Sequence, residues 1–129
     1  MLNVPKALLE TRVKKETLHR SGKRLLLEIA GALKLSPEAY DIRSNKGGNA
    51  VMGEVTLHSD HLYLMVHVGM GSELKVLYRT CKGRKDFSGG MNHFIGVSEL
   101  ASATASERFI AKLKQLNSLG IREANHQAA

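Results

Sequence analysis

Hydrophobic residues in the first third of the chain recur at the spacing of a single helix face. They predict an amphipathic helix over residues 18–35, which ends before Pro37 because a residue that precedes proline avoids the helical conformation. Leu9 and Val13 lie off this face, so the chain either changes direction near Gly22 or begins with a separate short helix. The residues of the predicted apolar face are Leu18, Leu25, Leu26, Ile29, Ala32 and Leu33.

From residue 40 onwards the hydrophobic period changes to two, which is the period of a β-strand. Four such runs are separated by short turns rich in Gly, Asn, Ser and Asp, and short turns join antiparallel neighbours. The pattern therefore predicts a four-stranded antiparallel meander. Its strands are residues 40–43, 51–58, 62–68 and 74–79.

A second helix is predicted near the C-terminus. Thr104 and Glu107 have the spacing of a capping box, and Gly120 stands where a C-terminal cap is expected. Residues 123–129 carry no pattern and are expected to fray, which leaves residues 1–122 as a single domain. The apolar face of this helix consists of Phe109, Ile110, Leu113 and Leu116.

These elements predict an α+β fold, an α-β-β-β-β-α two-layer sandwich with both helices on one face of the sheet. The other face stays uncovered and carries an apolar patch. Because exposed apolar patches commonly mark partner surfaces, a homodimer through this face is one hypothesis. Base stacking, as on RNA-binding sheets, is disfavoured because only one aromatic residue is expected there. The residues of the predicted interface are Met52, Tyr63, Met65 and Leu77.

Composition adds a strong positive charge. The 129 residues include 19 Lys and Arg against 12 Asp and Glu, a net charge of +7. Residues 1–35 hold eight basic and three acidic side chains, and residues 79–93 hold four basic and one acidic. A basic surface of this kind speeds encounters with polyanions, so the expected partner is a nucleic acid, a phosphorylated small molecule or an acidic protein.

The remaining composition excludes several classes. A single cysteine, Cys81, permits no internal disulfide and no cysteine-based metal cluster, which favours a reducing, cytoplasmic location. No apolar run approaches the roughly 20 residues that span a bilayer. No sequence pattern calls for a cofactor.

The stretch CKGRKDFSGGMNHF, which follows the fourth predicted strand, combines cations with glycines. Glycines let backbone N–H groups approach an anion, and an arginine can bind a phosphate through two nitrogens. A connection this long is usually functional or disordered, and Phe87 and Phe94 argue against disorder. In the alternative interpretation the loop is only an ordered connection in which Asp86 pairs with Arg84 or caps a turn. The predicted ligand-binding residues are Arg79, Lys82, Arg84, Lys85, Ser88, Gly89, Gly90, Asn92 and His93.

The meander also brings the turn at residues 59–60 to the same end of the sheet as this loop. Histidines and a carboxylate near a phosphate site could act as acid and base, so His58, His61, His93 and Asp86 are weak catalytic candidates. A metal site is not predicted, because strand geometry sends His58 and His61 to different sides.

The sequence thus favours a small, non-enzymatic, intracellular protein that binds RNA, DNA or a signalling nucleotide. The glycine-rich loop and the basic face of the N-terminal helix would supply the phosphate contacts. Two alternatives stay open. One is a protein–protein regulator that self-associates through the open sheet face and binds an acidic partner. The other is a small phosphodiester or nucleotide hydrolase that uses the histidines.

Overall fold

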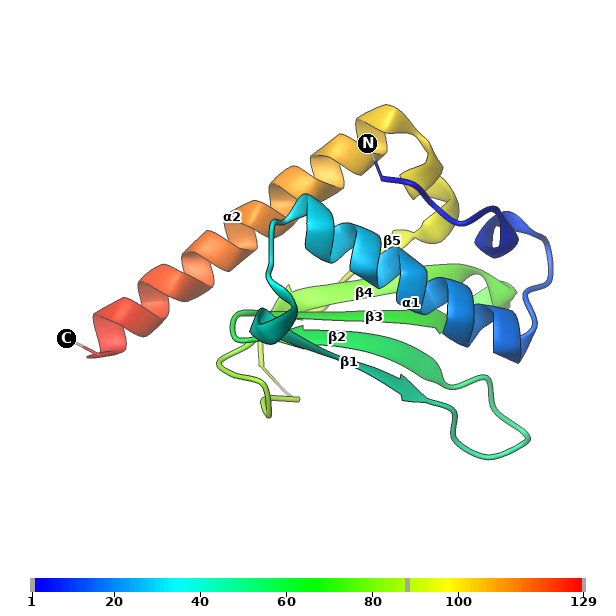
Figure 1. Cartoon of the computed structure of the whole chain (residues 1–129), viewed down its shortest axis with the longest axis horizontal. Coiled ribbons are helices and arrows are strands. Elements are labelled where there is room, and N and C mark those ends of the chain that lie inside the picture. The colour runs from blue at the N-terminus through cyan, green and yellow to red at the C-terminus, as the bar shows by residue number, and fades with distance from the viewer. Residues whose placement is uncertain (1, 88, 129) are drawn as a thin grey trace.

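Two long helices and one antiparallel sheet make up the chain (Figure 1), an α+β fold as the sequence predicts. The computed structural model describes residues 2–87 and 89–128, with side chains as far as residue 125. In chain order the elements are η1 (Lys6–Leu9), α1 (Lys15–Ala32), η2 (Pro37–Ala39), β1 (Tyr40–Asn45), β2 (Glu54–Ser59), β3 (Leu62–Val68), η3 (Met70–Ser72), β4 (Leu74–Thr80), β5 (His93–Gly96), η4 (Val97–Ala101) and α2 (Ala103–Ala128), where η marks a short 3₁₀ helix.

The sheet is a meander in which each strand pairs with the next in an antiparallel sense, in the order β1-β2-β3-β4-β5. The predicted strands correspond to β1 to β4. The sequence analysis expected four strands, and the structure has five. The fifth, β5, pairs along the outer side of β4 and leaves β1 and β5 as the two edges.

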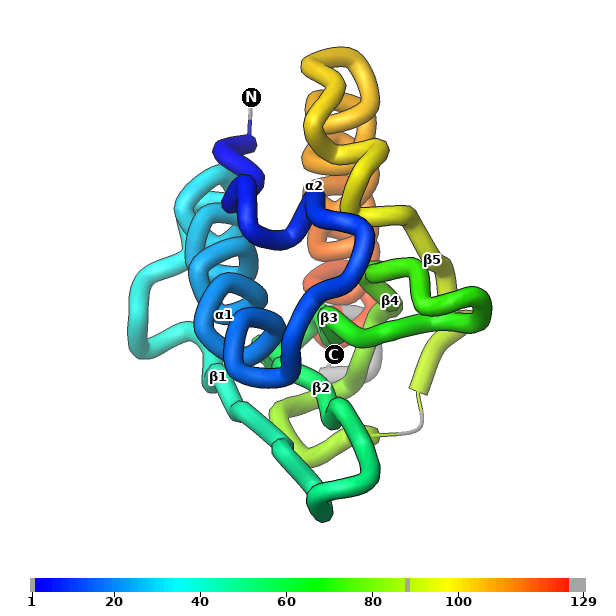
Figure 2. The backbone as a smooth tube through the Cα atoms, turned by 90° about the vertical axis from the view of Figure 1, so that its right-hand side faces the viewer, coloured from blue at the N-terminus to red at the C-terminus, as the bar shows by residue number. Residues whose placement is uncertain are grey.

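Both helices cover the same face of the sheet (Figures 1 and 2). Helix α1 packs on β2 and β3, and α2 packs on β3 and β4. Gly22 brings α1 close to the sheet, because a Cβ there would lie 3.4 Å from Val55 and 3.5 Å from Val66. The largest fully buried core residues include Leu18, Leu25, Leu26, Ile29, Val55, Leu57, Leu64, Val66 and Leu113.

Some local predictions are wrong. Thr104 does not cap α2: the helix begins at Ala103, and the Ser102 hydroxyl accepts a hydrogen bond from the backbone N–H of Ala105 (3.4 Å). Helix α2 continues past Gly120 to Ala128, so this glycine is not a C-terminal cap. A Cβ at Gly120 would lie 2.9 Å from the Cβ of His61, and the glycine instead lets α2 pass close to the β2–β3 turn. The predicted fraying of residues 123–129 stays a prediction.

Met52 does not lie on the open face of the sheet. The residue precedes β2 and packs against the hydrophobic core on the helix side. Gly53, with φ of +74°, separates it from the strand and breaks the alternation that would have placed Met52 beside Glu54 and Thr56. The open-face patch that the sequence predicts therefore loses one member.

Candidate functional site

The glycine-rich loop, residues 81–92, joins β4 to β5 and folds back over the open face of the sheet. Arg79 of β4 holds it there. One guanidinium nitrogen donates to the carbonyl oxygens of Gly89 (2.7 Å) and Thr80 (3.2 Å), and the other to that of Asp86 (3.5 Å). The guanidinium also lies 4.3 Å from the centre of the Tyr63 ring. Arg79 is only 4% exposed, so it acts as a structural anchor for the loop.

Arg84 attaches the outer part of the loop to two other segments. Its Nε donates to Asp60 in the β2–β3 turn (3.2 Å), and its guanidinium lies 3.6 Å from Asp41 of β1. It also donates to the carbonyl oxygen of Glu38. Asp86, which the alternative interpretation has either pairing with Arg84 or capping a turn, accepts a hydrogen bond from the backbone N–H of Lys82 (2.9 Å). Arg84 is thus surrounded by acceptors of the protein itself.

His58 of β2 lies between the sheet and the loop and contacts the loop. Its Nε2–H donates to the carbonyl oxygen of Gly83 (2.7 Å), and its ring makes edge contacts with Tyr63 (5.0 Å between centroids) and Phe87 (5.2 Å). The imidazole is 1% exposed, and its Nδ1 has no hydrogen-bond partner among the described residues. Burial is the main cause that lowers the pKa of His58, so the ring is neutral at pH 7.

The two central glycines of the loop are required by close packing. A Cβ at Gly89 would lie 2.2 Å from a carboxylate oxygen of Asp86. Gly90 has φ of +73°, and a Cβ there would lie 2.6 Å from the carbonyl oxygen of Thr80. Close packing, of Gly90 against β4 and of Gly89 against Asp86 within the loop, is therefore a reason for glycine at both positions that does not depend on an anion.

Between the loop and the sheet lies a pocket of about 270 Å³. Small-molecule sites usually begin at about 300 Å³, so this pocket fits one planar ring rather than a large ligand. Burial raises the pKa of the Tyr63 hydroxyl, which therefore stays protonated and able to donate a hydrogen bond at neutral pH. The pocket is lined by Tyr63, Met65, Leu77, Arg79, Phe87, Gly89, Gly90 and Asn92.

Apolar side chains are exposed at the pocket and on the neighbouring loop and strand. Phe87 is 61% exposed and Phe94 is 52% exposed, and Met91 in the same loop is 75% exposed. The register of the strands puts Phe94 opposite Leu77, which lies opposite Met65 in turn. The open side of the sheet therefore carries three aromatic residues rather than the one that the sequence analysis expected.

The predicted ligand-binding residues lie in several different places in the structure. Arg79, Gly89, Gly90 and Asn92 line the pocket. Lys82 and Lys85 are exposed at the surface of the loop, whereas Arg84 joins the loop to β1 and the β2–β3 turn. His93 is turned away: it stacks on Tyr78 (5.2 Å), whose ring contacts Phe109 on the helix side. Ser88 lies outside the described residues.

The catalytic candidates do not converge. His58 is buried under the loop on the open side, and His93 lies on the helix side. His61 and Asp86 line a second cavity of about 220 Å³, between the loop and the last turns of α2. Cys81 lines the same cavity, but its thiol donates to the Ser59 carbonyl oxygen (3.3 Å), and burial raises its pKa. A thiol of this kind is a poor nucleophile.

Tyr63 and Met65, two residues of the predicted interface, lie on the open side of the sheet. Leu77 also lies there, but it is only 8% exposed. The exposed apolar surface is therefore displaced from β4 towards Phe87, Met91 and Phe94.

None of the protein-family models, curated proteins and solved structures compared with this chain matches it. Within residues 2–87 and 89–128, no helix has the length and apolarity to span a membrane. The same part of the chain contains no group of three or more His, Cys, Asp or Glu side chains placed to hold a metal ion.

Proposed function

We propose that this protein binds single-stranded nucleic acid without catalysing a reaction, and that an unpaired base occupies the pocket under the glycine-rich loop. One observation carries the proposal: Tyr63 and Phe87 line a ring-sized pocket on the open side of a basic protein, and Phe94 is exposed on the same side of the sheet, opposite Leu77. Single-stranded nucleic acids are commonly bound by stacking bases on aromatic side chains of a sheet face.

The polar groups at the pocket suit a base better than a phosphate. Asn92 lines the pocket and can both donate and accept a hydrogen bond, as the edge of a base requires. Arg79 directs its donors at loop carbonyls, so it gives the Tyr63 ring a cationic neighbour rather than offering a phosphate clamp. Phosphate contacts then come from the exposed cations around the loop, Lys82 and Lys85, for which the described residues provide no ion pair.

Anisotropy of a fluorescent single strand of about five nucleotides tests the proposal. Phe87→Ala removes the most exposed ring at the pocket and should weaken binding by about tenfold, since stacking on one base contributes about 1–3 kcal/mol. Met70→Ala is the matched control, because Met70 is 94% exposed but lies in the β3–β4 turn at the other end of the sheet. Equal affinity of the Phe87 variant, the Met70 variant and the wild type would contradict the proposal.

The same exposed side chains support a second candidate, a protein–protein interface on the open face. Since Leu77 is buried, the substitution that separates the two candidates is Met91→Glu. An interface predicts that this change abolishes self-association in sedimentation equilibrium. Nucleic-acid binding predicts a monomeric wild type and a moderate loss of affinity for the single strand.

A further inference from the structure

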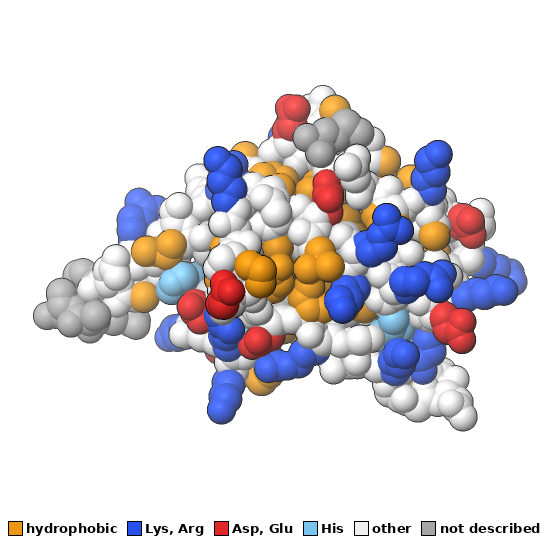
Figure 3. Space-filling view, viewed as in Figure 1, with side chains coloured by type: hydrophobic (Ala, Val, Ile, Leu, Met, Phe, Trp, Pro, Cys, Tyr) orange, Lys and Arg blue, Asp and Glu red, His pale blue; other side chains and the backbone are white. Residues whose placement is uncertain are grey.

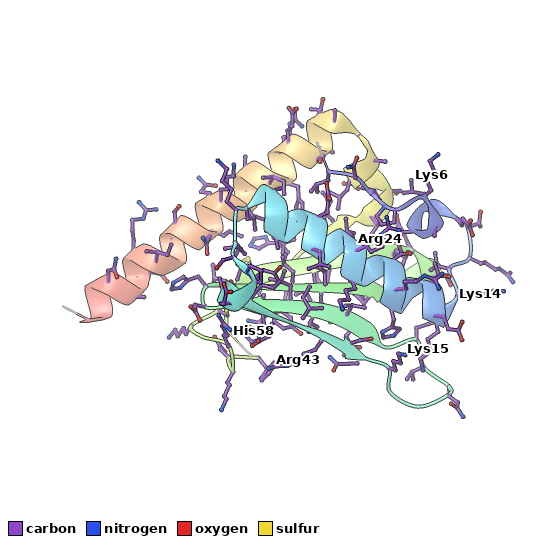
Figure 4. The ribbon with its side chains drawn as sticks, in the orientation of Figure 1. Lys6, Lys14, Lys15, Arg24, Arg43 and His58 are labelled. Atoms are coloured by element: carbon purple, nitrogen blue, oxygen red, sulfur yellow. The ribbon has the colours of Figure 1, made fainter. Side chains whose placement is uncertain are left out.

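Basic side chains form a strip along one side of the molecule. Figure 3 shows Lys and Arg side chains gathered over the N-terminal half of α1, and Figure 4 places the labelled members on the helix, on the segment before it and on β1. The acidic residues of the same helix are only Glu16 and Glu28. We call this surface the basic strip; it consists of Lys6, Lys14, Lys15, Arg24 and Arg43.

Side chains of α1 fix the helix against the β1 edge. His19 is buried and bonds through Nδ1 to the Ser44 hydroxyl (2.5 Å) and through Nε2–H to the carbonyl oxygen of Met52 (2.8 Å). Lys15 donates to the carbonyl oxygen of Gly48 in the β1–β2 connection (2.9 Å). The cations of α1 therefore hold a defined position relative to the edge strand.

Three members of the basic strip, Lys6, Lys14 and Arg24, differ from Arg79 and Arg84 because their side chains form no hydrogen bond or ion pair within residues 2–87 and 89–128. In the described part of the chain, Lys6, Lys14, Lys15 and Arg24 form no ion pair. Lys14 and Arg24 are exposed to solvent. Cations held on one surface without acidic partners attract an extended polyanion.

Arg43 connects the strip to the pocket. Its guanidinium lies 5.8 Å from the centre of the Phe87 ring, at the pocket rim, and its nearest acidic group is 3.9 Å away in Asp41. The strand that bears it, β1, is six residues long and spans about 20 Å. A mononucleotide in the pocket cannot reach α1, whereas a strand of several nucleotides can.

We infer that the basic strip binds the phosphate backbone of the strand whose base occupies the pocket, along a path that crosses the β1 edge at Arg43 and continues over α1. This inference rests on the proposed function and makes the ligand a polynucleotide rather than a free nucleotide. A lipid surface fits less well: Leu27 is the one large apolar residue exposed on α1 among the described residues, whereas interfacial helices carry a broad apolar face.

The test compares two labelled oligouridines, of about three and about fifteen nucleotides, by anisotropy over a salt series. Lys14→Gln/Arg24→Gln removes two charges from the strip. Lys112→Gln/Arg122→Gln removes one lysine and one arginine from exposed positions on α2 and serves as the matched control. The strip variant should bind the long strand about tenfold more weakly, with a salt slope shallower by about 1.4, which corresponds to two phosphates at about 0.7 each.

The short strand should bind the strip variant and the wild type equally, and the control variant should resemble the wild type with both strands. Equal losses of affinity for the long strand in the two double variants would show an effect of net charge alone and would overturn the inference. An unchanged affinity of the strip variant for the long strand would also overturn it. So would binding to phosphatidylserine vesicles that the strip variant loses while its binding to oligouridine is unchanged. Phe87→Ala separates the two proposals: if it binds the short strand like the wild type, the proposed function has failed, whatever the strip variant does.

Discussion

The two basic regions of the chain use their cations in opposite ways. At the loop end of the sheet, the guanidinium groups of Arg79 and Arg84 are directed at backbone carbonyls and at two aspartates. On α1, Lys14 and Arg24 extend into solvent, and within the described residues no acidic group pairs with them. The first region uses positive charge to hold a loop in place, and the second leaves its positive charge exposed to solvent.

This difference shows why a basic, glycine-rich stretch is not by itself a phosphate site. A cation contributes to ligand binding only when the fold leaves its donors available. Under the proposed function, Arg79 and Arg84 hold the loop that covers a pocket for a planar ring, and phosphate contacts fall to lysines and to the helix. Substitutions in each region test that division.

Arg79→Met should destabilise the protein by about 3 kcal/mol, because the loop carbonyls lose their donor in a buried site. Arg24→Met, on the exposed face of α1, should change stability by less than about 0.5 kcal/mol. Urea unfolding measures both. Similar losses of stability in the two variants would show that the two arginines do not differ in role.

Gly90→Ala should lower the free energy of unfolding by about 2 kcal/mol, because it forces an L-residue into φ of +73° and brings Cβ against Thr80. Gly83→Ala is its control: it lies in the same loop, and a Cβ there meets nothing within 4 Å. Thermal unfolding, followed with and without a short single strand, reports both stability and binding. If Gly83→Ala is as harmful as Gly90→Ala, close packing is not the reason for the glycine.

Lys14→Asp should stabilise the protein by about 1 kcal/mol while it weakens binding of a long single strand. Lys14 is the N-cap residue of α1 and makes no capping hydrogen bond, whereas aspartate is a preferred cap and suits the positive end of the helix dipole. Lys112→Asp, within α2, should give no such gain. The comparison implies that lysine at position 14 lowers stability but contributes to binding. A Lys14→Asp variant that is less stable than the wild type would contradict this.

The smallest expected effect is a pH dependence from His58. Because its folded pKa lies below the usual 6.5, the unfolded chain binds more protons as the pH falls below that value, and stability should decline there. His58→Gln keeps a donor for the Gly83 carbonyl but does not titrate, so it should reduce this decline as the pH falls below about 6.5. Parallel stability curves for the variant and the wild type would exclude His58 as the titrating group.

The sequence predicts the helices and the first four strands because long periodic patterns reflect burial on one face. It misses β5, because His93–Gly96 is only four residues long and ends in glycine, too short for an alternating pattern. That omission also hides Phe94, and with it the aromatic character of the open face. The burial of Arg79 depends on tertiary packing, and the position of Met52 on the helix side depends on the backbone conformation of Gly53. No local pattern in the sequence reveals either.

Amide chemical-shift mapping with an unlabelled single strand of about three nucleotides tests the central claim most directly. We expect the largest shifts on Tyr63, Leu77, Phe87 and residues 89–92, with little change in α1, because a short strand fills the pocket without reaching the basic strip. Shifts confined to α1, or the same pattern with inorganic phosphate, would contradict a base-binding pocket under the glycine-rich loop.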